Sequence, residues 1–190
     1  QRAEALERAE LLFATATQER PGQYGARILT ETGKLITNVD LPMRGHDVTY
    51  SATAGRAVVF ARRPGTFAVV FDPDGAAAPL TIASPAGRHF FGHGAFAPDG
   101  KLLYATENDF ERGRGVIGIY DVAGGYRRIG EFETYGVGPH ELILLPDGRT
   151  FAIANGGIET HPDYGRAELN LDEMDPSLCF VDSRDGSLVG

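Results

Sequence analysis

The chain has 190 residues, of which 42% are apolar, and this is enough for one substantial domain with a continuous core. Acidic residues outnumber basic residues by 26 to 18, the net charge is -8, and no stripe rich in Lys and Arg occurs, which makes nucleic acid and anionic membranes poor partners. The single cysteine, Cys179, allows no intrachain disulfide, and no apolar run approaches the roughly 20 residues that cross a bilayer.

The first expected elements are a short helix and an incomplete repeat unit. Apolar residues within 1–12 recur at the spacing of one helical face, so we expect an N-terminal helical segment there and a β-region over residues 11–190. Leu11–Thr15 echoes Leu102–Thr106 further along the chain, and two more strands are expected within Tyr24–Leu41. A partial unit therefore precedes the first complete one.

Three histidines divide the rest of the chain at equal intervals. His46, His93 and His140 lie 47 residues apart and then 47 apart again, each before the same succession of short strands. In the second and third units the first strand ends in a Pro-Asp-Gly turn, Pro98–Gly100 and Pro146–Gly148, because Pro presets one backbone angle and Gly accepts a positive φ. Equal spacing at this length indicates a structural repeat.

The second unit shows the content of one repeat. Three strands are expected at Ala95–Ala97, Lys101–Thr106 and Val116–Tyr120, with a polar loop at Glu107–Gly115 between the second and the third, and a fourth strand around Tyr126–Phe132. Four antiparallel strands in each repeat of about 47 residues are typical of a β-propeller blade.

The predicted fold is therefore all-β: a β-propeller of four-stranded antiparallel blades, of which the chain supplies about three and a half. Propellers typically close with about four to eight blades. An open half-propeller exposes a large apolar sheet face. We expect this face to be covered by missing sequence, by a second copy in a homo-oligomer, or by a rearranged closure.

Strand direction predicts which loops lie beside the histidines. In a blade, the loop before the first strand and the loop between the second and third strands emerge on the same side. This places the three histidines at one rim of the central channel, beside the loops Arg62–Gly65, Glu107–Arg114 and Asn155–Pro176. The third loop is longer than its counterparts by about fourteen residues and carries a fourth histidine, His161, and inserted loops on repeat scaffolds are where function concentrates.

Two interpretations of the histidines stay open. In the structural one, a Gly-His pair before the inner strand resembles that of WD40 blades, where the imidazole holds a loop in place. In the functional one, neutral imidazoles from adjacent blades bind copper, iron or zinc, and His161 or a loop carboxylate completes the shell. Pro139 replaces the glycine in the third unit, which favours a role beyond loop geometry. The candidate metal ligands are His46, His93, His140 and His161.

Polar residues of the three neighbouring loops are weaker candidates for binding. Arg62 and Arg63 can bind a carboxylate or phosphate, although paired arginines in a loop more often form a solvated rim. The segment Glu107–Asp109 clusters oxygen atoms of the kind that calcium prefers. His89, in a predicted strand, is expected at the surface or at the edge of the core rather than as a ligand. The candidate binding residues are Arg62, Arg63, Glu107, Asn108, Asp109, Asn155, Tyr164 and Arg166.

Several segments together resemble a bacterial family of unknown function. They are Gly92–Gly100, Thr106–Asp109, Arg114–Asp121, Gly138–Leu142 and Ala154–Arg166. The likeness spans about residues 11–190, and the run His-Pro-Asp-Tyr-Gly-Arg at 161–166 is its most specific part. The resemblance implies an exported seven-bladed propeller, a periplasmic location, and a link to metal uptake, since such proteins are often encoded beside imelysin-type iron-regulated proteins.

These observations lead to one principal hypothesis of function and two alternatives. The principal hypothesis is a non-catalytic periplasmic propeller that binds a transition metal, or a metal-handling partner protein, through the end of the molecule that carries the histidines. The first alternative is a protein-interaction scaffold whose histidines are structural. The second is a divalent-metal-dependent hydrolase that resembles lactonases.

Overall fold

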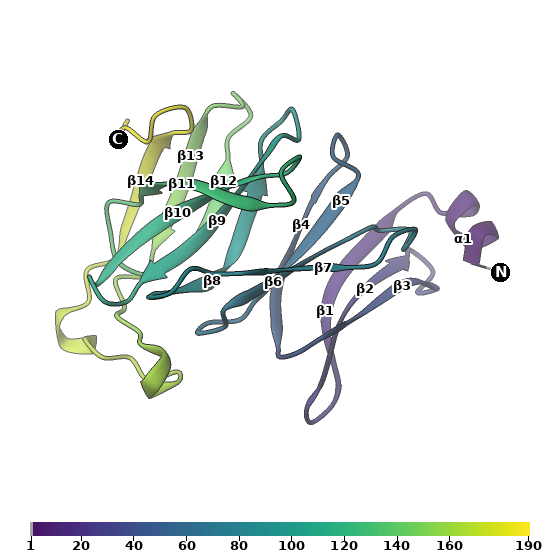
Figure 1. Ribbon diagram of the computed structural model, residues 1–190, viewed down its shortest axis with the longest axis horizontal. Helices are drawn as coiled ribbons and strands as arrows, with labels where there is room; N and C mark the ends of the chain where they lie inside the picture. Colours follow the sequence, from purple (N-terminus) through teal and green to yellow (C-terminus); the bar gives the residue numbers. More distant parts are fainter. Residues whose placement is uncertain (1) are drawn as a thin grey trace.

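The computed structural model describes residues 2–190, which form four antiparallel sheets and one short helix (Figure 1). The first sheet contains β1 (Leu12–Arg20), β2 (Gln23–Thr30) and β3 (Leu35–Leu41), and the second contains β4 (Gly45–Ser51), β5 (Arg56–Ala61), β6 (Phe67–Phe71) and β7 (Leu80–Ala83). The third contains β8 (Arg88–Phe96), β9 (Leu102–Asp109), β10 (Arg114–Asp121) and β11 (Arg127–Glu133), and the fourth contains β12 (Pro139–Leu144), β13 (Thr150–Asn155) and β14 (Ser177–Asp182). Helix α1 (Arg2–Arg8) precedes the sheets, and two 3-10 turns, Pro162–Tyr164 and Leu171–Glu173, lie between β13 and β14.

In every sheet, strands that follow one another in the chain pair side by side. The four sheets succeed one another across the molecule and do not close into a ring (Figure 1). The predicted all-β fold is thereby confirmed as an open β-propeller of about three and a half blades.

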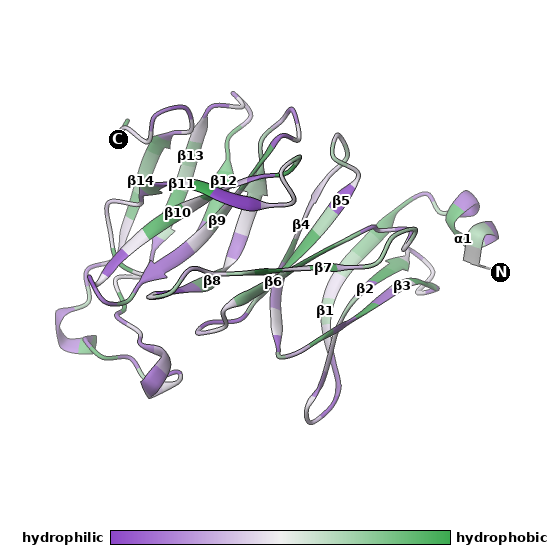
Figure 2. Ribbon diagram, viewed as in Figure 1, coloured by the Kyte–Doolittle hydropathy of each residue, from purple (hydrophilic) through white to green (hydrophobic). Residues whose placement is uncertain are grey.

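Both faces of the middle sheets are buried, because successive side chains of a strand point to opposite faces and each face meets another sheet. In β5, Ala57 and Val59 pack with apolar residues of the first sheet, whereas Val58 and Phe60 pack with residues of the third. A strand buried on both faces needs an unbroken apolar run, which β5 provides. Figure 2 shows apolar residues along the strands and hydrophilic residues in the segment after β13.

A third apolar cluster joins the last two sheets. Tyr104 and Ile117 of the third sheet pack with Phe151, Ile153 and Val181 of the fourth. The rings of Tyr104 and Phe151 lie 4.7 Å apart at their centroids, in an edge-to-face arrangement. Each neighbouring pair of sheets therefore shares its own core.

The two outer sheets are each incomplete in a different way. In the second sheet the second strand, β5, contacts the first strand of the next sheet, β8. Strand β1 contacts β4, the first strand of the second sheet, in the same way. The first sheet therefore contributes the second, third and fourth strands of a unit. The fourth sheet contributes the first three strands of a unit. Among the described residues, a single bridge between Val181 and Leu188 stands where the fourth, outer strand would pair. This matches the partial unit expected before His46.

The Pro-Asp-Gly turns are present as predicted. Gly100 and Gly148 have φ angles of 70° and 67°, in the left-handed region that glycine adopts without a Cβ clash. The Gly100 amide donates to the Ala97 carbonyl and the Gly148 amide donates to the Leu145 carbonyl, both at 2.9 Å. These turns lie at the opposite end of the blades from the inserted segment (Figure 1).

Two element boundaries differ from the sequence prediction. The helix ends at Arg8 rather than near residue 12, because Leu12 already pairs with Thr30 of β2. The polar run Glu107–Asp109 is not a loop but the last part of β9, where polar side chains are buried by pairing with arginines and amides. No helix in the described part of the chain is long and apolar enough to span a membrane.

Candidate metal centre

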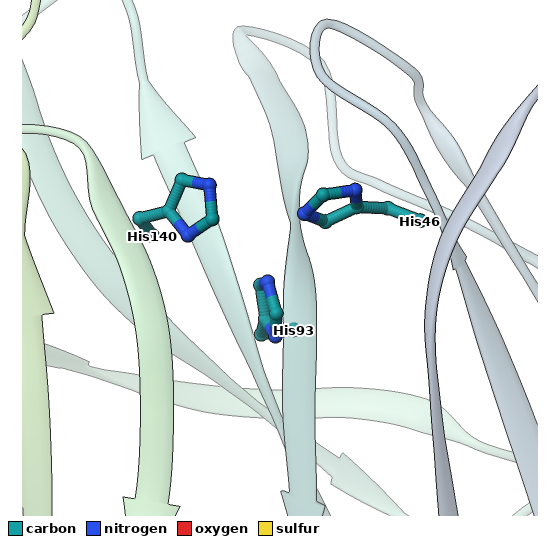
Figure 3. A group of neighbouring side chains, drawn as sticks. All are labelled: His46, His93 and His140. Carbon is teal, nitrogen blue, oxygen red and sulfur yellow. The ribbon is translucent and has the colours of Figure 1, made fainter.

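His46, His93 and His140, here called the histidine trio, converge from three adjacent sheets. His46 and His140 are the second residues of β4 and β12, and His93 lies in β8, where the pairing with β9 shifts register between Phe90 and Gly94. The ring centroids are 4.8, 5.1 and 5.5 Å apart, and Figure 3 shows the three rings facing one common point. Each histidine lies within a register shift of the first strand of its sheet, so the repeat brings three imidazoles together.

The nitrogen separations are close to those of a metal site. One ligand nitrogen from each ring can be chosen so that all three lie within 4.8 Å of one another. Three nitrogens bound tetrahedrally to one zinc ion at 2.0–2.1 Å would be roughly 3.3 Å apart. Small side-chain rotations therefore suffice to bring the trio to bonding geometry.

His46 and His140 are kept neutral by their surroundings, which metal binding requires. Burial lowers the pKa of His46 to about 4, and repulsion from His93, His140 and Arg62 adds to the effect. Burial also lowers the pKa of His140, again with a contribution from His93. An imidazole that stays unprotonated near neutral pH keeps a lone pair free for a metal ion.

His93 has a carboxylate on one ring nitrogen and no partner on the other. Its Nδ1 lies 3.1 Å from Oε1 of Glu141 and 3.6 Å from Oδ2 of Asp47. Its Nε2 is buried and lacks a hydrogen-bond partner among the described residues. A carboxylate that accepts from one nitrogen and fixes the tautomer, while the second nitrogen faces the metal, is the usual arrangement around a metal-bound histidine.

Glu141 and Asp47 were not among the residues singled out from the sequence. Each directly follows a repeat histidine, at positions where the second unit has Gly94. The signal was present in the sequence, as an acidic residue after His46 and after His140, but only the fold shows that both carboxylates face the third histidine.

Glycine residues before the histidines allow the close packing of the trio. Gly92 has a φ of 115°, and a Cβ at this position would lie within 3.1 Å of the Cβ of His46 and overlap its ring. Gly45 sits against Val59 and Leu41, where a Cβ would lie at 2.9 and 3.0 Å from their side chains. Gly92 therefore makes room for the imidazole of His46, and Gly45 makes room for the apolar side chains of the neighbouring strands.

The structure does not bring His161 into the trio, contrary to the expectation that it completes the shell. His161 precedes the 3-10 turn Pro162–Tyr164, and its Nδ1 accepts a hydrogen bond from the Asp163 amide at 3.2 Å. Its ring packs edge-on against Phe110 at 4.7 Å and lies 5.8 Å from the exposed ring of Tyr164. The cap and the aromatic contacts hold His161 against its own loop and Phe110, outside the trio.

The arginines expected to bind an anion lie beside the trio. Burial lowers the pKa of Arg62, and repulsion from Arg166, Arg44 and Arg63 lowers it further, which indicates that the four charges are close together. The guanidinium of Arg63 stacks over the Phe91 ring at 5.8 Å. Arg62, Arg63 and Arg166 therefore form a positive group next to the histidines.

The expected hard-cation segment is occupied by internal partners instead. Glu107 accepts from the Tyr120 hydroxyl at 2.6 Å and pairs with Arg128 at 2.8 Å. Asp109 pairs with arginines that include Arg114, at 3.1 Å. Burial alone would raise the pKa of Asp109, but these arginines hold it below its usual value. The carboxylates thus form ion pairs within the third sheet rather than a shared oxygen cage.

Asn108 and His89 form a buried polar link to the inserted loop that was not predicted. His89 is fully buried, and its Nδ1 donates to the Phe90 carbonyl at 2.9 Å. Its Nε2 accepts from the Asn108 amide at 3.0 Å, and the same amide donates to the Thr160 carbonyl at 2.9 Å. His89 was expected at the surface or core edge, because the approach of Thr160 could not be inferred from local sequence.

Asn155 has a comparable structural position at the end of β13. Its amide donates to the Thr134 carbonyl at 2.9 Å and to the Ser177 hydroxyl at 3.2 Å. The side chain is buried and ties the two ends of the inserted loop to the third sheet. Asn155 therefore supports the loop.

Comparison with known proteins places this arrangement in a family context. Residues 39–190 match the model of a family described as Protein of unknown function (DUF1513). No curated protein matches the chain.

Two solved structures share the fold. One is hydrazine synthase of Kuenenia stuttgartiensis, with a TM-score of 0.63 and 15% identity over 89% of this chain and 45% of that chain. The other is a chain of the mitotic checkpoint complex, with a TM-score of 0.60 and 13% identity over 95% of this chain and 51% of that chain. The chain spans about half the length of these structures, and at such low identity the likeness concerns the fold alone.

Proposed function

The chain belongs to the DUF1513 family, whose function is unknown, and from the geometry of its site we propose that it binds a divalent transition metal ion through the histidine trio. Neutral imidazoles suit zinc, copper and iron, and three of them leave further coordination positions for water or a ligand. His46, His93 and His140 would be the protein ligands. Glu141 and Asp47 would hold the ring of His93.

The observation that carries this proposal is the state of His93. A buried nitrogen without a partner costs free energy, about 1–3 kcal/mol for an unmet hydrogen bond. The Nε2 of His93 is such an atom among the described residues, while Nδ1 faces two carboxylates. A metal ion at the centre of the trio would satisfy Nε2, whereas a purely structural histidine would be expected to hydrogen-bond through both nitrogens.

The resemblance to exported propellers encoded beside iron-regulated proteins supports the further proposal of a periplasmic role in metal handling. In that setting the protein would hold the ion for a partner protein rather than use it in catalysis. Fractionation of cells that express the natural protein at its native level would test the location. Recovery in the cytoplasm would contradict this part of the proposal alone.

Calorimetric titration of chelator-treated protein with Zn²⁺ and with Cu²⁺ tests the metal site. We expect one ion per chain for the unaltered protein. His46→Ala, His93→Ala and His140→Ala should each weaken binding by at least about 100-fold, and Glu141→Gln by about 10-fold to 100-fold, as outer-shell partners do. Metal at 100 times its Kd should also stabilise the fold by about 2.7 kcal/mol.

His161→Ala is the matched control, because it removes a histidine from the same end of the molecule but outside the trio. Metal affinity should be unchanged in this variant. The absence of stoichiometric uptake by the unaltered protein would contradict the proposal. A lower melting temperature of His93→Ala, together with no metal uptake by either protein, would favour the structural interpretation of the histidines.

A further inference from the structure

A pocket of about 140 Å³ opens directly beside the histidine trio, between the first and second sheets. His46, Arg44 and Arg62 line it, together with Gly45 and the segment Ala16–Gln18 of β1. The two arginines are held side by side by the backbone, since the Arg62 amide donates to the Arg44 carbonyl at 2.9 Å. Two arginines and a histidine therefore line a space of the size of a small molecule.

The positive charge of this pocket has no internal counterpart. Among the described residues, no carboxylate lies within salt-bridge distance of Arg44, Arg62 or Arg166, and Arg63 has only Glu168, at 3.9 Å. This local excess of positive charge stands against a net charge of -8 for the whole chain. Most arginines of the third sheet, by contrast, are paired with carboxylates, as Arg128 is with Glu107.

The residues of the pocket suit an anion. Arg44 and Arg62 offer charged donors around one small volume, which is the chemistry that recognises oxyanions.

We propose that this pocket binds a small oxyanion, with Arg44 and Arg62 as the charged donors. The shared chemistry is that of phosphate and of compact carboxylates such as citrate. The site is defined by its own residues and does not require a metal in the trio. If the trio does hold a metal, an anion in the pocket lies beside it, because His46 lines both sites.

Titration of metal-free, chelator-treated protein with inorganic phosphate and, separately, with citrate tests the proposal. We expect saturable binding of at least one of the two with a Kd of about 1 mM or tighter. Arg44→Gln and Arg62→Gln should each weaken binding about tenfold or more, since each removes a charge-assisted hydrogen bond. The tighter of the two probes identifies the source of the oxyanion.

Further variants keep the result interpretable. Arg44→Lys and Arg62→Lys keep the charge but remove the planar guanidinium donors, so weaker binding in these variants shows an ordered site rather than general attraction to positive charge. Arg127→Gln, which removes an exposed arginine from β11, should leave binding unchanged. Variants are compared only after thermal melting shows that each is folded.

The proposal is overturned if neither anion saturates the unaltered protein up to about 10 mM. It is also overturned if the double change of Arg44 and Arg62 to Gln binds as tightly as the unaltered protein. Because the titration uses metal-free protein, the loss of the metal proposal would leave this result intact, and the reverse also holds.

Discussion

At the scale of single residues, Gly92 determines where the ring of His46 can lie. Its φ of 115° lies in a region that residues with a Cβ rarely adopt, and the space next to its Cα is taken by the His46 ring. A turn alone would need only the backbone angle. Here the missing side chain also makes room for an imidazole from the neighbouring sheet.

Gly92→Ala should therefore displace His46 and weaken metal binding about tenfold or more, with a loss of about 1–3 kcal/mol of stability from backbone strain. Calorimetric titration and thermal melting measure the two effects. Gly22→Ala is the matched control, because Gly22 also has a positive φ, 82°, but nothing lies within 4 Å of its added Cβ. Equal metal affinity in both variants would contradict the packing role assigned to Gly92.

The depressed pKa of His46 predicts how the stability of the metal-free protein depends on pH. Its pKa falls from 6.5 in the unfolded chain to about 4 in the folded protein, so between these values the unfolded state binds more protons. Stability should be complete above about pH 6.5 and fall as the pH is lowered toward 4. The pKa of His140 is lowered as well and acts in the same direction.

We expect the melting temperature of the unaltered protein to fall more between about pH 7 and about pH 5 than that of His46→Gln. Glutamine keeps a polar side chain in place and removes the titration. Calorimetry of both proteins in chelator at a series of pH values measures the difference. Parallel curves for the two proteins would show that His46 is not held neutral.

At the scale of elements, the inserted loop between β13 and β14 is held to the third sheet through Asn108. The Asn108 amide joins His89 of β8 to Thr160 of the loop, and all three side chains are buried. Burial lowers the pKa of His89, which keeps its Nε2 free to accept this hydrogen bond. The loop is therefore docked by a small polar network rather than by an apolar core of its own.

Asn108→Leu should loosen the loop, because the Thr160 carbonyl and His89 lose their shared donor, at a cost of about 1–3 kcal/mol. Trypsin should then cut faster after Arg166, which is exposed in this loop. Asn38→Leu, at an exposed position of β3, is the control and should leave the cleavage rate unchanged. If Asn108→Leu resists trypsin as well as the unaltered protein, the network does not hold the loop.

At the scale of the whole molecule, the fourth sheet has one apolar face without a neighbour. On the fourth sheet, Ile143 and Leu178 are 55% and 61% exposed and lie on the same face as Phe180 and Ala152. In the interior of the molecule the equivalent faces pack against the next sheet. Such a face is costly to leave in water, since contiguous apolar patches on monomers are rarely large.

We therefore predict that the 190-residue chain on its own self-associates through this face. Sedimentation velocity at increasing concentration should show the association, and Ile143→Lys combined with Leu178→Lys should abolish it. Leu80→Lys, at an exposed residue of β7, is the control and should associate like the unaltered protein. A monomer at every concentration would mean that the exposed face is tolerated.

Much of the architecture could be predicted because it depends on short-range patterns. The Pro98–Gly100 turn, the apolar run Ala57–Ala61 and the repeat of histidines are local signals, and each has its expected place in the open propeller. Glu107–Asp109 was misassigned to a loop, because polar side chains inside a strand are stable only when distant partners such as Arg128 neutralise them. Those partners belong to other strands and leave no mark in the local sequence.

For the candidate site, the sequence by itself determined the repeat period and hence that His46, His93 and His140 share one rim, since strand direction alternates regularly within each unit. Only the tertiary structure decided that the three rings meet within metal-binding reach, that Glu141 supports His93, and that His161 stays in its own loop. The physical reason is that the repeat period and the alternating strand direction determine the end of a blade at which a residue lies. Side-chain rotation and the packing between sheets fix what that residue touches.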